Sequence, residues 1–341
     1  MSSKKGIYII VSVVSIFILL GFSVVFIAVY AFPFDPQNNS SVISQNSSSF
    51  FEIELNSSGE FNSETSSTFE PNEVTSGYDG KIIKAFLSPY ISNTSYRNIY
   101  LNNKTATDIN LASIYDLPLE TKIKKCTEPE VLILHTHATE GYLPQEKEYY
   151  SQEDIEQTHD EERSVLKIGE IICQELKEYG INAIHDKTLH DDPSYTNSYN
   201  RSAETTLKYL ENYPSIKVVI DIHRDSISSN GGLIRGISEQ KGKDAAQIMF
   251  VAGSETGNVE GFPNWEQNLG LVLRLQEISE TLYPGFARSI YFTSKKYNQH
   301  LSIGSLLIEV GSSVNTIEEA EYSAKLLGRI LGVGLNLLAE E

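Results

Sequence analysis

Histidine and glutamate side chains that follow or interrupt apolar stretches are the residues that could do chemistry in this sequence. The segment VLILHTHATEGY begins as an apolar run typical of a buried strand and continues into His135, His137 and Glu140. A second apolar run, in IKVVIDIHRDS, ends at His223, and Glu309 interrupts a third run, in SLLIEVGSS. Because such groups are costly in a core unless they are paired, their place at three apolar runs indicates a functional site.

The types and spacing of these residues favour a zinc site. Two histidines and one carboxylate, with one position left open, form a common catalytic zinc shell. His137 and Glu140 are close enough in sequence to reach one ion from a tight turn, and His223 would be the third ligand. Glu309 would then be free to take a proton from water and return it to a leaving amine. The pattern therefore predicts zinc-assisted amide hydrolysis with Glu309 as the catalytic base.

Four neighbouring residues are candidates for the pocket or for support of the ligands. His135 alternates onto the same side as His137, one step nearer the core. Arg224 and Asp225 could form a structural pair or support the site, and Arg224 is also placed to hold a substrate carboxylate. Glu162 could replace Glu140 as the zinc ligand, although acidic residues are ordinary in the first turn of a helix. The choice between the two glutamates stays open.

Strands that alternate with helices must position these residues. Helical spacing of apolar residues predicts helices in SVLKIGEIICQELKEYG, SYNRSAETTLKYLENYP, NWEQNLGLVLRLQEISETLYPG and TIEEAEYSAKLLGRILGVGLNLL. The candidate-bearing runs, with INAIHD and DAAQIMFVAGSE, predict the strands. This alternation predicts an α/β fold with a mostly parallel, twisted sheet and helices on both faces. Parallel strands share one carboxyl edge, which would bring the distant candidates together.

The N-terminal part of the 341-residue chain differs from the rest. Residues 6–32 carry no charge and follow Lys4 and Lys5, which predicts one transmembrane helix, a cytoplasmic N-terminus and an extracytoplasmic remainder. A cleaved signal peptide is the alternative. The next segment is rich in Ser, Asn and Glu, as disordered linkers are. The predicted organisation is a cytoplasmic tip and transmembrane helix in 1–32, a disordered linker in 33–80, a transition segment in 81–125 and a zinc hydrolase domain in 126–341.

Charge and the remaining motifs narrow the function further. A net charge of −18 argues against binding of nucleic acid, which needs a basic face. Cys126 and Cys173 lie outside any metal-ligand spacing; they could pair, but Cys173 falls on an apolar helical stripe typical of a core residue. The sequence has no Gly-Xaa-Ser-Xaa-Gly elbow, no glycine-rich phosphate loop and no His-Glu-Xaa-Xaa-His pair. Nucleophilic serine chemistry is therefore not indicated.

Four segments in a fixed order resemble a known family. They are ILHTHATEGY, DIHRDS, MFVAGSETGNVEGFPNWEQNLGLVLRL and KKYNQHLSIGSLLIEVGSSVNTIEEAEYSAKLLG. Together they resemble the stage II sporulation protein P family of endospore-forming bacteria, from about Glu128 to the C-terminus and with the single N-terminal membrane helix. The resemblance implies a zinc-dependent N-acetylmuramoyl-L-alanine amidase that acts on peptidoglycan and also cuts cross-linked stem peptides. The implied role is removal of septal wall during engulfment, at the mother-cell septal or engulfing membrane, with the stage II proteins D and M as partners.

The resemblance also bears on the site residues. His137, Glu140, His223 and Glu309 fall on motif positions of the family. Ordinary cell-wall amidases instead carry the metal-binding glutamate before the first helix, where Glu162 lies here, so the carboxylate ligand is not decided by the resemblance.

Two other functions fit the sequence. The order of the candidate ligands also resembles zinc carboxypeptidases, which would trim a peptide end. A catalytically silent anchor that binds wall material is the remaining alternative.

Overall fold

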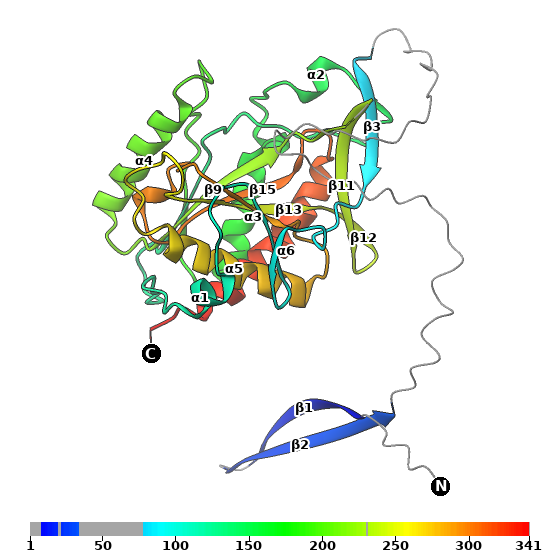
Figure 1. Cartoon of the computed structure of the whole chain (residues 1–341), viewed down its shortest axis with the longest axis vertical. Coiled ribbons are helices and arrows are strands. Elements are labelled where there is room, and N and C mark those ends of the chain that lie inside the picture. Colours follow the sequence, from blue (N-terminus) through cyan, green and yellow to red (C-terminus); the bar gives the residue numbers. More distant parts are fainter. Residues whose placement is uncertain (1–7, 20–21, 34–77, 230, 341) are drawn as a thin grey trace. The chain divides into compact units, whose positions relative to one another are not determined.

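The computed structural model describes residues 8–19, 22–33, 78–229 and 231–340 (Figure 1). Most of the predicted linker, residues 34–77, lies outside the described residues. The chain divides into two units, Met1–Phe50 and Phe51–Glu341, and each is considered by itself.

In the first unit, β1 (Tyr8–Leu19) pairs with β2 (Phe22–Pro33) in antiparallel register. The predicted transmembrane helix is therefore wrong: among the described residues, no helix has the length and apolar character needed to cross a membrane. The predicted single-pass topology, with a cytoplasmic N-terminus and an extracytoplasmic domain, depended on that helix and is wrong with it. The physical reason is that a charge-free run rich in Val, Ile, Phe and Tyr also suits strands, because these side chains favour β structure.

An eight-stranded sheet forms the centre of the second unit (Figure 1). Its strands in spatial order are β4 (Thr94–Tyr96), β5 (Ile99–Asn103), β14 (Ile290–Thr293), β13 (Ile248–Gly253), β15 (Ser305–Ser312), β9 (Val218–Asp225), β6 (Val131–Leu134) and β8 (Ala183–His185). Five of the seven neighbouring pairs are parallel, whereas β4–β5 and β13–β15 are antiparallel. The α/β class is confirmed, but the sheet is mixed.

Helices cover both faces of this sheet. The longer ones are α3 (Val165–Glu178), α4 (Ser198–Asn212), α5 (Trp265–Leu282) and α6 (Ile317–Asn336), and α1 (Leu111–Asp116) is shorter. Helices α3, α5 and α6 pack on one face, around the largest hydrophobic core. Helix α4 covers the other face, where its residues Tyr209 and Leu210 pack with Leu132, Leu134 and Val219 of the sheet.

Local sequence signals fix the ends of α3. The hydroxyl of Ser164 accepts a hydrogen bond from the N–H of Leu166 and so caps the helix N-terminus. Just past the helix, Gly180 has a φ of +72°, a conformation that favours glycine. Cys173 is partly buried against the main core on this helix, and among the described residues neither it nor Cys126 forms a disulfide.

Side chains alternate along the central strands, and this alternation directs the candidate residues. Ile133 and Ile220 are register partners in β6 and β9, and both join the core with α3 and α6. Val219 points to the opposite face, toward α4. Because successive side chains of a strand point to opposite faces, Asp221 and His223 follow Val219 to the α4 face.

A smaller sheet lies beside the main one (Figure 1). Its strands are β10 (Ser228–Ser229), β11 (Gly232–Gln240), β3 (Gly80–Ala85) and β7 (Tyr149–Tyr150), with β12 (Lys243–Ala246) paired to β11. Two short helical segments, α2 (Gln152–Ile155) and η1 (Glu161–Arg163), follow β7, and η2 (Gln299–Leu301) precedes β15. Residues 81–125, expected as a transition segment, thus supply β4 and β5 to the main sheet and most of β3 to the smaller one.

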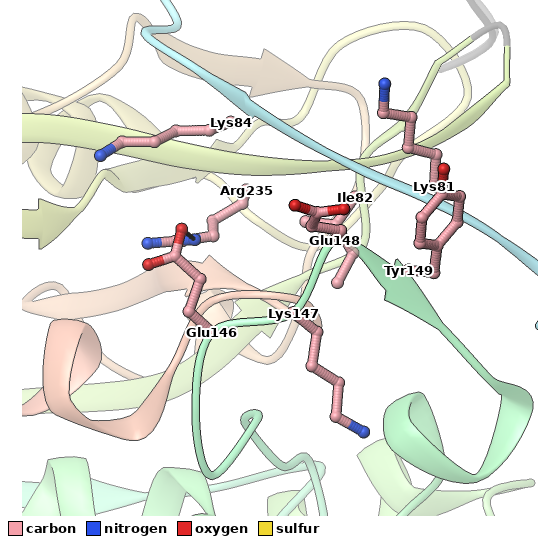
Figure 2. Close-up of a pocket in the computed structure, with 8 residues that line it drawn as sticks. All are labelled: Lys81, Ile82, Lys84, Glu146, Lys147, Glu148, Tyr149 and Arg235. Atoms are coloured by element: carbon pink, nitrogen blue, oxygen red, sulfur yellow. Dashed lines mark ion pairs between the residues drawn. The ribbon is translucent and has the colours of Figure 1, made fainter.

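Arg235 of β11 ties the smaller sheet to α6. Its guanidinium Nε lies 2.9 Å from Oε1 of Glu319, and another of its nitrogens pairs with Glu146 (Figure 2). Glu319 also accepts a hydrogen bond from the backbone N–H of Thr316 at 3.0 Å and completes the capping box of α6. The buried pair therefore holds the start of α6, which directly follows the strand that carries Glu309.

A cleft of about 300 Å³ lies beside this pair (Figure 2). It is lined by Lys81, Ile82, Lys84, Glu146, Lys147, Glu148, Tyr149 and Arg235. Three of its four basic side chains are paired with carboxylates, Lys84 with Asp244, Lys147 with Asp154 and Arg235 with Glu146 and Glu319. The cleft contains none of the candidate residues, and its paired charges suit a structural role.

Candidate metal and catalytic site

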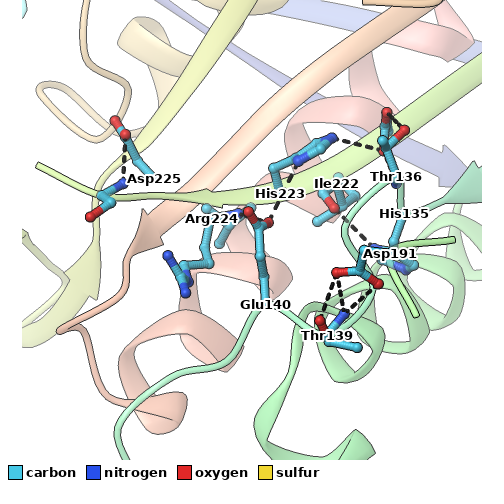
Figure 3. Close-up of polar contacts among 12 residues, drawn as sticks. His135, Thr136, Thr139, Glu140, Asp191, Ile222, His223, Arg224 and Asp225 are labelled. Carbon is cyan, nitrogen blue, oxygen red and sulfur yellow. Dashed lines mark hydrogen bonds and ion pairs between the residues drawn. The ribbon is translucent and has the colours of Figure 1, made fainter. Parts of the chain in front are cut away.

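The turn after β6 carries the first candidate ligands. Strand β6 ends at Leu134, so strand alternation does not continue to His137. The N–H of Glu140 donates to the carbonyl of His137 at 3.2 Å and closes a tight turn. The carboxylate of Glu140 then accepts a hydrogen bond from the backbone N–H of Arg224 at 3.0 Å, which holds it against the end of β9 (Figure 3). The predicted turn therefore exists, and it delivers Glu140 to the strand of His223.

His223 lies between the carboxylates of Glu140 and Asp221, and Figure 3 shows it beside Glu140. Its Nδ1 is 3.5 Å from Oε2 of Glu140, and its Nε2 is 3.0 Å from Oδ1 of Asp221, although the second contact is not aligned as a hydrogen bond. Burial opposes the charged imidazole, but the charges of Asp221 and Glu140 outweigh burial and raise the pKa of His223 well above its ordinary value. Burial likewise opposes ionised Glu140, yet His223 lowers the pKa of Glu140. The two form a charged pair.

His137 completes the group. Its ring lies edge-on to the ring of His223, with centroids 5.3 Å apart. Its Nδ1 is buried, and within the described part of the chain it has no hydrogen-bond partner. Burial lowers the pKa of His137, so the imidazole is held neutral with a lone pair available. A neutral, unpaired imidazole beside a His–Glu pair is the state that a metal ligand requires.

Glu309 faces this group from the neighbouring strand. It is the register partner of His223 in the parallel pair β15–β9. The residue as a whole is half-buried, but its Oε2 is buried and, among the described residues, lacks a hydrogen-bond partner. Burial, and next the charge of Asp225, raise the pKa of Glu309 to about 8. A carboxyl group tuned in this way can carry a proton near neutral pH.

Asp221 is a site residue that the sequence reasoning missed. It is buried, and it accepts hydrogen bonds from the backbone N–H and the hydroxyl of Thr136 at 2.8 and 2.6 Å. These bonds hold the carboxylate beside His223. The available signal was the alternation in DIHRD, which puts an acidic residue two positions before His223 and therefore on the same face of the strand.

His135 does not share a side with His137. Its Nδ1 donates to the carbonyl of Ile222 at 3.0 Å, and its Nε2 accepts from Nε2 of His185 at 2.8 Å. This pair is packed against Gly169 of α3, where an added Cβ would approach His185 Nε2 to 2.5 Å. Burial lowers the pKa of His135 to about 3, so it is neutral and binds the residue next to His223 rather than lining the pocket.

The structure separates the other predicted residues from the ligand group. Glu162 lies in η1, its side chain is 72% exposed, and it pairs with Lys167 at 2.8 Å. The guanidinium of Arg224 donates to the carbonyls of Gly141 and Ile155, each at 3.2 Å, so it holds the turn. The carboxylate of Asp225 pairs with Arg288 at 2.8 Å. Of the two glutamates predicted as possible ligands, Glu140 contacts His223, whereas Glu162 pairs with Lys167.

The donor set can be tested against a zinc ion. Two imidazoles and one carboxylate match the ligand types of catalytic zinc, and the buried Nδ1 of His137 is unpaired among the described residues. Within residues 8–19, 22–33, 78–229 and 231–340, however, no three His, Cys, Asp or Glu side chains already converge on a metal position. Instead, Glu140 and His223 face each other as a charged pair, with Oε2 of Glu140 3.5 Å from Nδ1 of His223. The residues fit a zinc ion in type, and binding of the ion would require His223 to lose its proton.

Comparisons with known proteins extend these observations. The family model described as Stage II sporulation protein P (SpoIIP) matches residues 37–332. The Stage II sporulation protein P of Bacillus subtilis (strain 168) is 29% identical over 205 residues, which are 57% of this chain and 48% of that protein. The chain thus matches about half the length of that relative.

Similar solved structures are bacterial amidases. The N-acetylmuramyl-L-alanine amidase Ami1 of Mycobacterium abscessus is 16% identical with a TM-score of 0.34, and the match covers 61% of this chain and 98% of that one. The CwlD amidase of Clostridioides difficile, solved with the GerS lipoprotein, is 14% identical with a TM-score of 0.35 and the same coverage. The amidase AmiC2 of Nostoc punctiforme is 12% identical with a TM-score of 0.33, covering 63% and 97%. These low TM-scores do not establish a shared fold.

The family model spans most of the chain, including the segments that carry His137, Glu140, His223 and Glu309. The resemblance seen in the sequence motifs is confirmed, and the protein belongs to the Stage II sporulation protein P family.

Proposed function

We propose that the protein is a zinc-dependent peptidoglycan hydrolase that cleaves the amide between N-acetylmuramic acid and L-alanine. The observations that carry this proposal are the buried Glu140–His223 pair, the ring of His137 beside it, whose Nδ1 has no partner among the described residues, and Glu309 on the neighbouring strand. This arrangement provides three ligands and one separate proton carrier, which is the minimum that metal-assisted amide hydrolysis requires.

His137, Glu140 and His223 would hold the zinc ion. The carboxylate of Asp221 lies beside Nε2 of His223, which leaves Nδ1, the nitrogen that faces Glu140, as the ligand atom. Bound zinc supplies Lewis-acid polarisation of the scissile carbonyl. The backbone N–H of Arg224 keeps the Glu140 carboxylate in place throughout.

Glu309 would move the proton. As a carboxylate it takes a proton from the attacking water, and it returns that proton to the nitrogen of the leaving L-alanine when the amide bond breaks. With a pKa of about 8 in the structure, Glu309 holds its proton at neutral pH. A positive charge at the three ligands favours the ionised form, so Glu309 becomes a base when the site is loaded.

Family membership supports a role in sporulation. Within that role we propose the removal of septal peptidoglycan during engulfment, with the stage II proteins D and M as partners, and a further cut in cross-linked stem peptides at the same site. A carboxypeptidase would need a group to hold the terminal carboxylate of its substrate. Arg224, the residue placed for that work in sequence, donates to two backbone carbonyls instead.

Digestion of purified peptidoglycan by the full-length chain tests the proposal. New amino-terminal L-alanine on the released stem peptides is the expected product; it should disappear with a chelator and return with added zinc. Release of D-alanine alone would point to a carboxypeptidase. Binding to the wall without any product would leave a silent wall-binding protein, and turnover that is indifferent to chelation would exclude the zinc site.

A further inference from the structure

One large side chain beside the ligand group is both exposed and held in place. The ring of Tyr195 stacks on the ring of His137 with centroids 4.1 Å apart and planes 7° from parallel. The residue is nevertheless 60% exposed. Because one face of the ring rests on His137, the exposure belongs largely to the opposite face, which is open to whatever enters the site.

The loop that carries Tyr195 is fixed on both sides of it. Arg201 of α4 donates to the carbonyls of Ser194 and Thr196, the two chain neighbours of Tyr195, and its Nε donates to the carbonyl of His190. These bonds to consecutive parts of the loop leave little freedom at Tyr195. Its position over His137 is therefore built into the loop by Arg201.

A second set of bonds ties the same loop to the ligand turn. The buried carboxylate of Asp191 accepts a hydrogen bond from the hydroxyl of Thr139 at 2.6 Å, and Nδ1 of His190 donates to the carbonyl of His135 at 2.8 Å. Thr139 lies between His137 and Glu140 in the turn. The loop and the turn thus form one fixed assembly, and the exposed ring of Tyr195 keeps its place relative to His137.

Two further tyrosines continue this surface. Tyr199, in the first turn of α4, meets the ring of His137 edge-on at 5.6 Å between centroids. The ring centroid of Tyr297 lies 5.9 Å from that of Tyr199. The hydroxyls of Tyr199 and Tyr297 form no hydrogen bond with another described side chain or backbone group, and both residues are half-buried. An aromatic wall with free hydroxyls suits a ligand that is apolar on its ring faces and polar at its edges.

We propose that Tyr195 is the platform on which a sugar ring of the glycan strand stacks, so that cleavage of the muramoyl amide requires a saccharide next to the scissile bond. This inference rests on the proposed function and names the part of the substrate that the site recognises. The apolar C–H face of a pyranose packs on the open face of the tyrosine ring. In peptidoglycan only the sugars offer a ring, since the stem peptide that leaves from the other side of the amide has no aromatic residue. Stacking at Tyr195 would orient the muramoyl carbonyl over the ligand group, since His137 lies directly beneath.

Binding of soluble muropeptides to the full-length chain tests the platform. The probes are a disaccharide tetrapeptide and the same tetrapeptide without sugar, measured by calorimetry in a Glu309→Gln background so that turnover does not consume them. Tyr195→Ala should weaken binding of the disaccharide tetrapeptide by about 5- to 10-fold, the effect of losing one aromatic contact. Tyr195→Phe should keep the affinity, and the sugar-free peptide should bind all three proteins equally.

Leu207→Ala is the matched control, because Leu207 is another exposed apolar residue of the same region, 51% exposed on α4. It should leave both affinities unchanged. The platform would be overturned if the Tyr195→Ala protein bound the disaccharide tetrapeptide as tightly as the parent protein does. It would also be overturned if Tyr195→Ala weakened binding of the sugar-free peptide by the same factor, or if the disaccharide tetrapeptide did not bind the parent protein.

Turnover of wild-type protein separates this inference from the proposed function. A chain that binds the disaccharide tetrapeptide through Tyr195 but does not hydrolyse peptidoglycan would keep the platform and remove the hydrolase. A chain that hydrolyses peptidoglycan with Tyr195→Ala indistinguishable from wild type in binding and in KM would keep the hydrolase and remove the platform.

Discussion

Glu309 lies directly opposite His223 in the parallel register of β15 and β9. The two residues belong to different apolar runs, and only the pairing of those runs as neighbouring strands brings the proton carrier to the ligand group. His223 is charged and Glu309 is protonated in this arrangement, because carboxylates surround the first and burial isolates the second. His223 and Glu309 therefore have different protonation states and different proposed roles, although in the sequence both are simply polar residues within apolar runs.

Glu309→Gln should keep the fold and the zinc but lose most turnover. Glutamine has nearly the same shape, so β15 stays intact, but it has no ionisable proton to exchange. The expected fall in kcat is on the order of 100-fold or more. Released stem peptides and zinc content should be measured on the same preparations, with Glu239→Gln as control, because Glu239 is an exposed residue of the otherwise largely buried β11. A variant that still cleaves at the wild-type rate would exclude Glu309 as the base, and one that loses zinc would make it a ligand.

The stability of the zinc-free protein should depend on Glu309 and pH. The folded-state pKa of about 8 lies above the ordinary value of 4.5. The stabilising contribution of the protonated carboxyl is therefore fully present below about pH 4.5 and is lost progressively as pH rises to about 8. The free energy of unfolding of wild type, relative to Glu309→Gln, should fall by about 3 kcal/mol between pH 5.5 and pH 8. Denaturant titrations at both pH values measure it; a constant difference would mean that the carboxyl is not perturbed.

The two candidate glutamates should behave differently toward zinc. Glu140→Gln removes a charge that faces His223, and zinc affinity should fall by about 10-fold or more. Glu162→Gln breaks only an exposed ion pair with Lys167 and should leave the affinity within about twofold. Competition with a chromogenic chelator gives both constants. The reverse order of effects would move the carboxylate ligand to Glu162.

Local patterns predicted the central strands and the long helices because these elements carry strong periodic signals. Val165–Glu178 has both an apolar stripe and caps, and β9 and β15 each contain a buried run of Val, Ile or Leu. The antiparallel partner β13 could not be distinguished from a parallel one, since a buried strand reads the same in either direction. The helix prediction for the charge-free N-terminal run is wrong for a related reason. Hydrophobicity without periodicity does not distinguish a helix from a strand.

The candidate site was predictable where residue type and strand ends sufficed. Glu140 contacts His223, and the ring of His137 lies against that of His223, because β6 and β9 are parallel neighbours. The supporting residues come from elsewhere. The position of Tyr195 over His137 depends on a loop held by Arg201, and no local pattern reveals such a long-range contact. The prediction that His135 shares a side with His137 is wrong because it extends strand alternation to His137, three residues past the end of β6.

Asp221 should matter for the metal although it is not among the three proposed ligands. Its carboxylate is fixed by two hydrogen bonds from Thr136 and lies 3.0 Å from Nε2 of His223, so it sets which imidazole nitrogen faces Glu140. Asp221→Asn keeps the size of the side chain and removes the charge. Zinc affinity should fall by about 10- to 100-fold, the usual effect of losing a partner behind a ligating histidine.

The same substitution has a second, independent effect on His223. Without the charge of Asp221, the histidine loses the leading attraction that raises its pKa, so the pKa of His223 should fall toward its ordinary value. NMR titration of the imidazole in zinc-free protein measures this shift, and the zinc competition assay measures affinity. Asp225→Asn is the control, because Asp225 pairs with Arg288 and does not contact His223. If Asp221→Asn changed neither the titration of His223 nor the affinity for zinc, the carboxylate would serve only to anchor Thr136.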